Sequence, residues 1–244
     1  CKGCQHSDTV LVRVNSLPIA NINGILSICT GGSTVLTASG GTSYIWSTGE
    51  TSASISLTPT ITQSYSVTVT DGNGCQSSAS ATVIVNPLPS PTISGDLEIC
   101  LGESTTLTAS GGMEYEWSTG ETTASITVSP TTNTTYMVMA KDINGCQDYT
   151  TVIVLVRPVP SAQISGDNVI CISDSTSLLA SGGSSYLWSN GMTSASIKVS
   201  PTVNTDYVVT VSNVFGCFDT ARISVTVNPL PIAIITGNNS FCVG

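Results

Sequence analysis

Cysteines are the residues of this chain whose spacing could do chemistry. The sequence contains nine cysteines, and eight of them form two series with a constant period of 71 in residue number. One series is Cys4, Cys75, Cys146 and Cys217, and the other is Cys29, Cys100, Cys171 and Cys242. Small extracellular domains often use cysteine pairs as disulfides, whereas metal sites need closely spaced ligands. Because each period holds two distant cysteines and the chain has a single histidine, His6, we predict disulfides and no metal or cofactor. Cys1 fits neither series.

The pairing of six of these cysteines has two solutions. The favoured one lies within a repeat and closes loops of about 47 residues, each worth about 4 kcal/mol in chain entropy. Its bonds are Cys29–Cys75, Cys100–Cys146 and Cys171–Cys217. If a repeat has seven strands in immunoglobulin order, however, its two cysteines lie at opposite ends, and a bond between neighbouring repeats such as Cys29–Cys146 becomes the alternative. Six strands would bring both cysteines to one end.

The elements that must position the cysteines repeat with the same period. Residues 43–55 read SYIWSTGETSASI and return, little changed, as residues 114–126 and 185–197. The chain is therefore a tandem array. We expect complete repeats at 17–86, 87–157 and 158–228, the C-terminal tail of a preceding repeat at 1–16 and the start of a following one at 229–244. Short proline-rich joints separate them, as in the Asn-Pro-Leu-Pro of residues 86–89.

Each repeat shows the period-two alternation of short β-strands. In the first repeat Leu36 and Ala38 share one face of residues 33–39, and residues 65, 67 and 69 are Tyr, Val and Val. The Asp-Gly-Asn-Gly of residues 71–74 is a strong hairpin signal. Six or seven strands per repeat, with frequent turns and no helical period, predict an all-β array of small immunoglobulin-like or PKD-like β-sandwiches.

The aromatic residues have a structural and a functional interpretation. Tyr44 and Trp46 share a face of one strand and could stack on a sugar ring, but their strict period and apolar neighbours favour a role in the core. The outward slot between them varies as Ile45, Glu116 and Leu187. The predicted core aromatics are Trp46, Trp117, Trp188, Tyr65, Tyr136 and Tyr207.

Other chemistry is weakly supported. Asp71, Asn73, Asp142 and Asn144 could bind calcium, but the hairpin turn itself needs these residue types. Paired carboxylates for glycoside hydrolysis would have to come from exposed positions, and the third repeat replaces them. Those positions are Glu50, Glu114, Glu116 and Glu121. We predict that the chain is not an enzyme.

Composition limits the partners. The net charge is −9 with only six basic residues, which is unsuited to binding nucleic acid or an anionic membrane surface. No apolar run is long enough to span a bilayer. We expect the neighbouring repeats of the same chain as partners, and surface polysaccharide or host surfaces as alternatives.

The string SYIWSTGETSASI, followed by SYSVTVTDGNGC at residues 64–75, resembles the Ig-like and PKD-like repeats of very large Bacteroidota surface adhesins. The SprB-type gliding-motility adhesin, exported by the type IX secretion system, is one such protein. The resemblance implies a secreted, cell-surface, multi-repeat fibre. Residues 213–216 depart from the pattern, reading NVFG in place of Asp-x-Asn-Gly. Thr9, Ser175 and Thr220 each follow an aspartate in the triplet that Bacteroidota modify by O-glycosylation, and they are candidate sites.

These observations predict a structural and adhesive stalk segment of a secreted bacterial cell-surface adhesin, with a role in surface attachment and gliding. The alternatives are a glycan- or polymer-binding repeat module and a filament-forming surface protein that pairs through strand edges.

Overall fold

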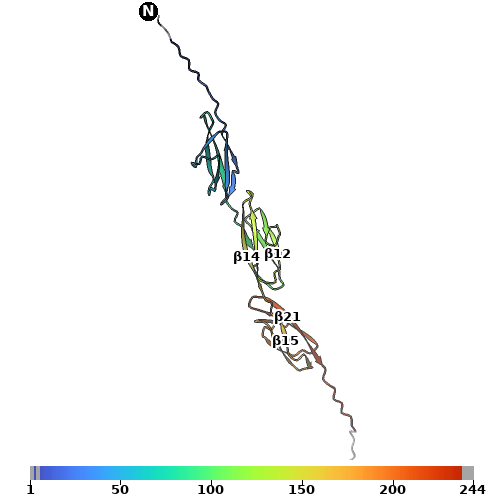
Figure 1. The fold of residues 1–244 in the computed structure, drawn as a ribbon. Coiled ribbons are helices and arrows are strands. Elements are labelled where there is room, and N and C mark those ends of the chain that lie inside the picture. The colour runs from blue at the N-terminus through green and yellow to red at the C-terminus, as the bar shows by residue number, and fades with distance from the viewer. Residues whose placement is uncertain (1–2, 4–5, 238–244) are drawn as a thin grey trace, which may run out of the picture. The chain divides into compact units, whose positions relative to one another are not determined.

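A computed structural model describes residue 3 and residues 6–237. This part of the chain contains strands and turns but no helix (Figure 1), and hence no helix that could span a membrane. Each of the three sequence repeats forms seven strands. The first has β1 (Asn21–Gly24), β2 (Ser27–Cys29), β3 (Thr34–Ser39), β4 (Ser43–Trp46), β5 (Ser54–Leu57), β6 (Gln63–Thr70) and β7 (Gln76–Asn86).

The second and third repeats follow the same plan. The second has β8 (Thr92–Ser94), β9 (Glu98–Cys100), β10 (Thr105–Ser110), β11 (Glu114–Trp117), β12 (Ser125–Val128), β13 (Thr134–Lys141) and β14 (Gln147–Arg157). The third has β15 (Gln163–Ser165), β16 (Val169–Cys171), β17 (Thr176–Ser181), β18 (Ser185–Trp188), β19 (Ser196–Val199), β20 (Thr205–Ser212) and β21 (Phe218–Asn228).

Two sheets build each repeat. In the first repeat, the three-stranded sheet has the order β1-β3-β5 and the four-stranded sheet has the order β2-β7-β6-β4. Neighbouring strands are antiparallel except β2 and β7, which are parallel and place Cys29 opposite Asn86. The initial strand is thus divided between the sheets, with β1 in one and β2 in the other. This arrangement confirms the predicted all-β, immunoglobulin-like β-sandwich.

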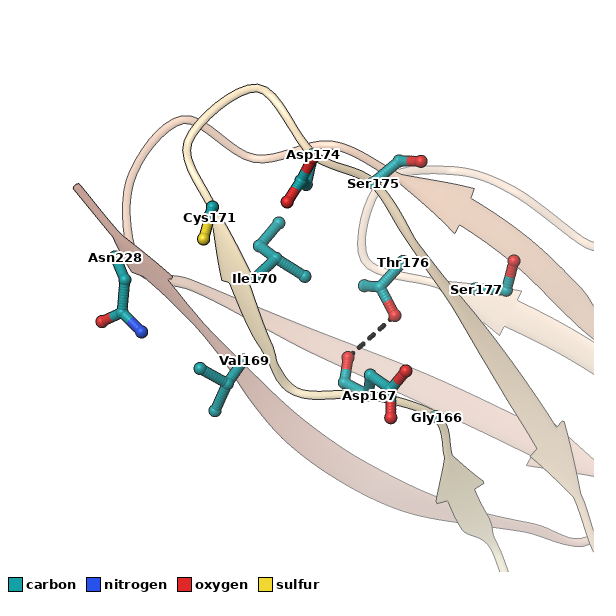
Figure 2. A pocket seen from close by; sticks show the side chains of 10 residues that line it. All are labelled: Gly166, Asp167, Val169, Ile170, Cys171, Asp174, Ser175, Thr176, Ser177 and Asn228. Carbon is teal, nitrogen blue, oxygen red and sulfur yellow. Dashed lines mark hydrogen bonds between the residues drawn. The ribbon is translucent and has the colours of Figure 1, made fainter. Parts of the chain in front are cut away.

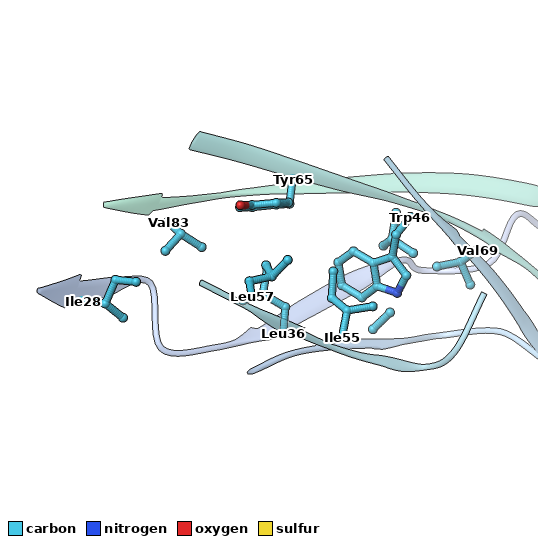
Figure 3. Packing of buried hydrophobic residues seen from close by; sticks show 10 residues of the cluster. Ile28, Leu36, Trp46, Ile55, Leu57, Tyr65, Val69 and Val83 are labelled. Carbon is cyan, nitrogen blue, oxygen red and sulfur yellow. The ribbon is translucent and has the colours of Figure 1, made fainter. Parts of the chain in front are cut away.

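The core of the first repeat lies between these two sheets. Strand β3 alternates strictly, with Thr34, Leu36 and Ala38 buried, and β6 contributes Tyr65, Val67 and Val69. Trp46 packs among the aliphatic side chains of this cluster (Figure 3). The third repeat buries the corresponding residues around Trp188. Alternation along the strands therefore supplies the inner faces of each sandwich.

A tight turn follows the cysteine that ends the second strand of each repeat; these strand cysteines are Cys29, Cys100 and Cys171. Its second residue has a positive φ, which is 81° at Gly31, 94° at Gly102 and 76° at Ser173. Glycine adopts this conformation at little cost, whereas an L side chain does not. The third repeat therefore holds a serine in a conformation that the first two assign to glycine.

The chain divides into two compact units. One comprises residues 1–94, 107–126 and 136–152, and the other residues 95–106, 127–135 and 153–244. The division passes through the second repeat, and the repeat boundaries expected from the sequence stay predictions. Residues 7–20 and 229–236 form no strand, and Val10, Leu11, Val12 and Val14 are exposed.

Candidate functional site

Two disulfides form the most specific chemistry in the described residues. Cys29 is bonded to Cys146 and Cys100 to Cys217, with Cα–Cα distances of 5.5 and 5.6 Å. Both bonds have a sequence separation of 117. Each bond therefore joins one repeat to the next, and each lies within one of the two compact units.

The pairing within a repeat that the sequence favoured is therefore wrong. Cys29 lies opposite Asn86, the last residue of β7, and Cys75 immediately precedes the first residue of β7. A strand of 11 residues spans about 36 Å, whereas a disulfide needs a Cα–Cα distance of about 4.4–6.8 Å. The repeat has seven strands, the case in which the sequence allowed Cys29–Cys146, and that alternative is correct.

Strand pairing fixes the position of the strand cysteine. The backbone N–H of Thr30 donates to the carbonyl oxygen of Asn86 at 2.8 Å, and the Asn86 amide donates to Ser27 Oγ at 2.8 Å. In the second repeat Leu101 N–H likewise donates to the Arg157 carbonyl at 2.8 Å. Strand pairing therefore places each of these cysteines beside the last residue of the following long strand, β7 or β14, directly before the proline joint.

A side-chain oxygen shapes the turn between the last two strands of each repeat. This turn carries the second cysteine of the repeat, and these hairpin cysteines are Cys75, Cys146 and Cys217. Asp142 Oδ1 accepts from the backbone N–H of Asn144 at 2.9 Å and of Cys146 at 2.8 Å. Partial desolvation raises the pKa of Asp142, but the hydrogen bonds from Cys146, Asn144 and Gly145 outweigh it, and the net pKa is lowered. Asp71 and Asn213 make the same pair of bonds in their hairpins.

The junction between the second and third repeats has additional contacts. The guanidinium of Arg157 lies 4.4 Å from the centre of the Phe215 ring, a cation–π geometry. Asn213 Nδ2 donates to the Pro158 carbonyl oxygen at 2.7 Å. Arg157 also pairs with Glu98 at 2.7 Å, and this hydrogen bond lowers the pKa of Glu98. Residues of the NVFG turn thus contact the end of the second repeat.

Sequence reasoning missed this contact. In the sequence, Phe215 stands out only as part of the departure from the Asp-x-Asn-Gly turn. The usable signal was a second departure, because Arg157 stands where the first and third repeats have Asn86 and Asn228. Two coordinated changes on facing sides of one junction indicate contact.

Two of the six predicted disulfide cysteines have no partner within the described residues. They are Cys75 and Cys171, and both are partly exposed. Cys146 and Cys217, the bonded counterparts of Cys75, are 0% and 1% exposed. Cys29 and Cys100, the bonded counterparts of Cys171, are partly exposed like Cys171 itself. Cys1, Cys4 and Cys242 lie outside the described residues.

The aromatic residues take structural positions. Trp46, Trp117 and Trp188 are each 2% exposed, and Trp46 Nε1–H donates to the Ser52 carbonyl at 2.9 Å. Tyr65, Tyr136 and Tyr207 are buried, and burial raises the pKa of Tyr136. Tyr44 is half-buried, with its hydroxyl bonded to the Gly41 carbonyl at 2.9 Å. None of these faces forms an open sugar platform.

The candidate catalytic and calcium-binding residues are not brought together. Glu50, Glu114, Glu116 and Glu121 are exposed, and Glu114 pairs with Lys141 at 3.0 Å. The described residues contain no cluster of three or more His, Cys, Asp or Glu side chains suited to a metal ion. Asp71 and Asp142 use their oxygens to hold their own turns, as described above. His6 is exposed and lies outside the strands.

Two surface features remain. Thr9, Ser175 and Thr220, the candidate glycosylation sites, are all exposed. A hollow of about 480 Å³ in the second repeat is lined by Met113, Tyr115, Glu116, Met139 and Lys141, among others. Except for the tyrosine, the first and third repeats have other residue types at these positions.

No protein-family model and no curated protein matches the sequence. Solved structures with some likeness include one on the host cell surface retention of a 1.5-MDa bacterial ice-binding adhesin (18% identity, TM-score 0.37, 89% of this chain and 100% of that one). Another is a Ca²⁺-stabilised adhesin that helps an Antarctic bacterium bind ice (18% identity, TM-score 0.41, 89% of this chain and 76% of that one). A third comprises immunoglobulin domains 1–5 of Sidekick-1 (13% identity, TM-score 0.33, 89% of this chain and 60% of that one). The function of this chain is therefore inferred from its own residues.

Proposed function

We propose that this chain is a stalk segment of a secreted bacterial cell-surface adhesin, and that its disulfides lock the joints between repeats. The observation that carries this proposal is the bond between Cys29 of one repeat and Cys146 of the next. A disulfide that served only to stabilise a small sandwich would join its own strands. A disulfide across the joint restricts bending and separation at the proline linker, which is what a stalk requires.

The two bonds also change how the chain carries load. Without them, force applied between Cys29 and Cys217 extends the whole peptide chain that connects these residues. The covalent path through both disulfides instead crosses to Cys146, returns along the second repeat to Cys100, and crosses again. At about 3.4 Å per extended residue, the greatest extension falls from about 640 Å to about 160 Å. This path does not include the proline linkers at the joints, and the linkers therefore bear none of the force.

The expected location follows from the same chemistry. Disulfides persist in oxidising compartments such as the cell exterior. The resemblance of residues 43–55 and 64–75 to SprB-type repeats extends the proposal to export by type IX secretion and to attachment during gliding. The chain's own residues support the stalk, and the resemblance alone supports this extension.

Single-molecule stretching tests the stalk. The chain would be held by tags at each end, and fully unfolded once oxidised and once reduced. We expect the reduced chain to extend about 480 Å further than the oxidised one, which is the difference between the two paths. Replacing Cys29, Cys100, Cys146 and Cys217 with serine should give the long extension under both conditions. Equal extensions of the oxidised and reduced wild-type chain would contradict the proposal.

A binding module is the second candidate, and the hollow beside Glu116 favours it. Its lining combines apolar Met113 and Met139 with charged Glu116 and Lys141. The folded, oxidised chain would be tested against glycans, polysaccharide-coated surfaces and matrix proteins. Saturable binding that Glu116→Leu abolishes would establish the module, since leucine occupies this position in the third repeat. Binding to none of them would leave these repeats as spacer.

A further inference from the structure

Cys75 and Cys171 occupy the same positions in their repeats as the cysteines that form the two observed disulfides. Cys171 occupies the position of Cys29 and Cys100 at the end of a short strand parallel to the last strand of its repeat. Cys75 occupies the position of Cys146 and Cys217 after the hairpin turn. In both observed bonds, the strand cysteine joins the hairpin cysteine of the following repeat, with a sequence separation of 117.

The surroundings of Cys75 and Cys171 match a junction that lacks its neighbouring repeat within the described residues. Hairpin cysteines that are bonded are almost completely buried, but Cys75 is partly exposed. Cys171 lies at a hollow of about 690 Å³ whose lining includes Ile170, Asp174 and Asn228 (Figure 2). Asn228 is the counterpart of Arg157, the residue that contacts Phe215 in the closed junction. Within the described residues, no neighbouring repeat contacts this end of the third repeat, the end that receives a neighbour at the second junction.

We propose that Cys171 bonds the hairpin cysteine of a further repeat of this type in the same polypeptide, at the same sequence separation as the two observed bonds. Cys75 bonds the strand cysteine of a repeat of this type that precedes it. Every repeat then carries one bond forward, through its strand cysteine, and one bond backward, through its hairpin cysteine. The result is an unbroken ladder of overlapping loops. This inference rests on the proposed stalk function. It adds that each strand cysteine bonds the hairpin cysteine of the repeat that follows it, at a fixed sequence separation.

Formation of each bond is a two-electron oxidation. The thiols of Cys171 and the hairpin cysteine lose two protons and two electrons and form one S–S bond. A disulfide oxidant such as oxidised glutathione accepts them and is reduced to two thiols, by way of a mixed disulfide on one of the two cysteines.

The test uses a chain lengthened by one period. A second copy of residues 158–228 is inserted after residue 228, which places a hairpin cysteine at a separation of 117 from Cys171, as in the observed bonds. The protein is oxidised with glutathione, alkylated and digested without reduction, and linked peptides are identified by mass. We expect Cys171 to be alkylated in the original chain, and bonded to the added hairpin cysteine in the lengthened one. Serine in place of that added cysteine is the matched control and should restore alkylation of Cys171.

Two results would overturn the inference. In one, Cys171 stays alkylated in the lengthened chain although Cys29–Cys146 and Cys100–Cys217 have formed, so that the stalk proposal survives and the ladder does not. In the other, Cys171 bonds Cys75 of a second copy, seen as a disulfide-linked dimer of the original chain, and the partner is then another molecule. Failure of the stalk itself would differ from both, because Cys29–Cys146 would then be missing.

Discussion

Cys29 and Cys75 lie at opposite ends of the same repeat, because β2 pairs in parallel with the end of β7 and Cys75 precedes its start. This relationship directs both cysteines to neighbouring repeats. The disulfides therefore join consecutive sandwiches and do not connect strands within one sandwich. Stability and stiffness of the chain should therefore depend on which cysteine is removed.

Loss of the disulfide at the first joint should be costly, whereas loss of Cys75, which has no partner within the described residues, should not. Cys29→Ser with Cys146→Ser removes a bond that joins residues at a sequence separation of 117, and chain entropy gives it about 5 kcal/mol. Cys75→Ser removes a thiol without a described partner and should leave the free energy of unfolding nearly unchanged. Denaturant unfolding, followed by tryptophan fluorescence, measures both. A loss of about 4 kcal/mol in the Cys75→Ser variant would show that Cys75 is bonded, and would support pairing within the repeat instead.

The hairpin of the second repeat should weaken in acid. The folded-state pKa of Asp142 is lowered, so its contribution is present above the unfolded-state pKa of about 3.9 and is lost as pH falls through the folded-state value. Asp142→Asn keeps the acceptor oxygen, as Asn213 does in the third repeat, and should remove this dependence. Amide hydrogen exchange at Cys146 between pH 5 and pH 2, corrected for intrinsic rates, provides the readout. An identical pH dependence in wild type and variant would refute this role of Asp142.

The second junction should loosen when its aromatic contact is removed. Phe215→Asn restores the residue found at Asn73 and Asn144 and removes the ring that faces Arg157. We expect faster hydrogen exchange around Pro158 and a lower denaturant midpoint, both modest because the contact is exposed. Val214→Ala changes the exposed neighbouring side chain and is the control. Equal effects of the two substitutions would mean that the ring contributes nothing to the joint.

The turn after Cys171 should be strained by its serine. Ser173 has a φ of 76°, a conformation that costs an L residue about 1 kcal/mol relative to glycine. Ser173→Gly should therefore raise the free energy of unfolding by about that amount, and Gly102→Ser, at the matching turn, should lower it similarly. A Cβ on Gly102 would meet no atom within 4 Å, so the comparison isolates the backbone. Thermal unfolding of both variants checks the signs, and a destabilising Ser173→Gly would contradict the interpretation.

Much of the fold could be predicted from local pattern. The alternation at Leu36 and Ala38 predicted a buried strand face, because it depends on residues close in sequence. The recurrence of Trp46 every 71 residues predicted a place in the core of each repeat. The parallel pairing of β2 with β7 could not be predicted, since it joins the beginning of the repeat to its end and β2 has only three residues. The disulfide partners depend on that pairing. For the same reason, Arg157 and Phe215 could be connected only once both ends of the junction were seen together.

The most direct test of the central claim is a disulfide map of residues 1–244, folded and oxidised. Alkylation is followed by digestion without reduction, with trypsin and a protease that cleaves after Glu. This separates peptide 14–50 with Cys29, peptide 51–98 with Cys75 and peptide 142–198 with Cys146 and Cys171, since Arg157 precedes a proline and is not cleaved. Locked joints between repeats predict that 14–50 is linked to 142–198 through Cys146 and that 51–98 carries an alkylated cysteine. A link between 14–50 and 51–98 would contradict the account, because the bond would then lie within one repeat and the joint would be free.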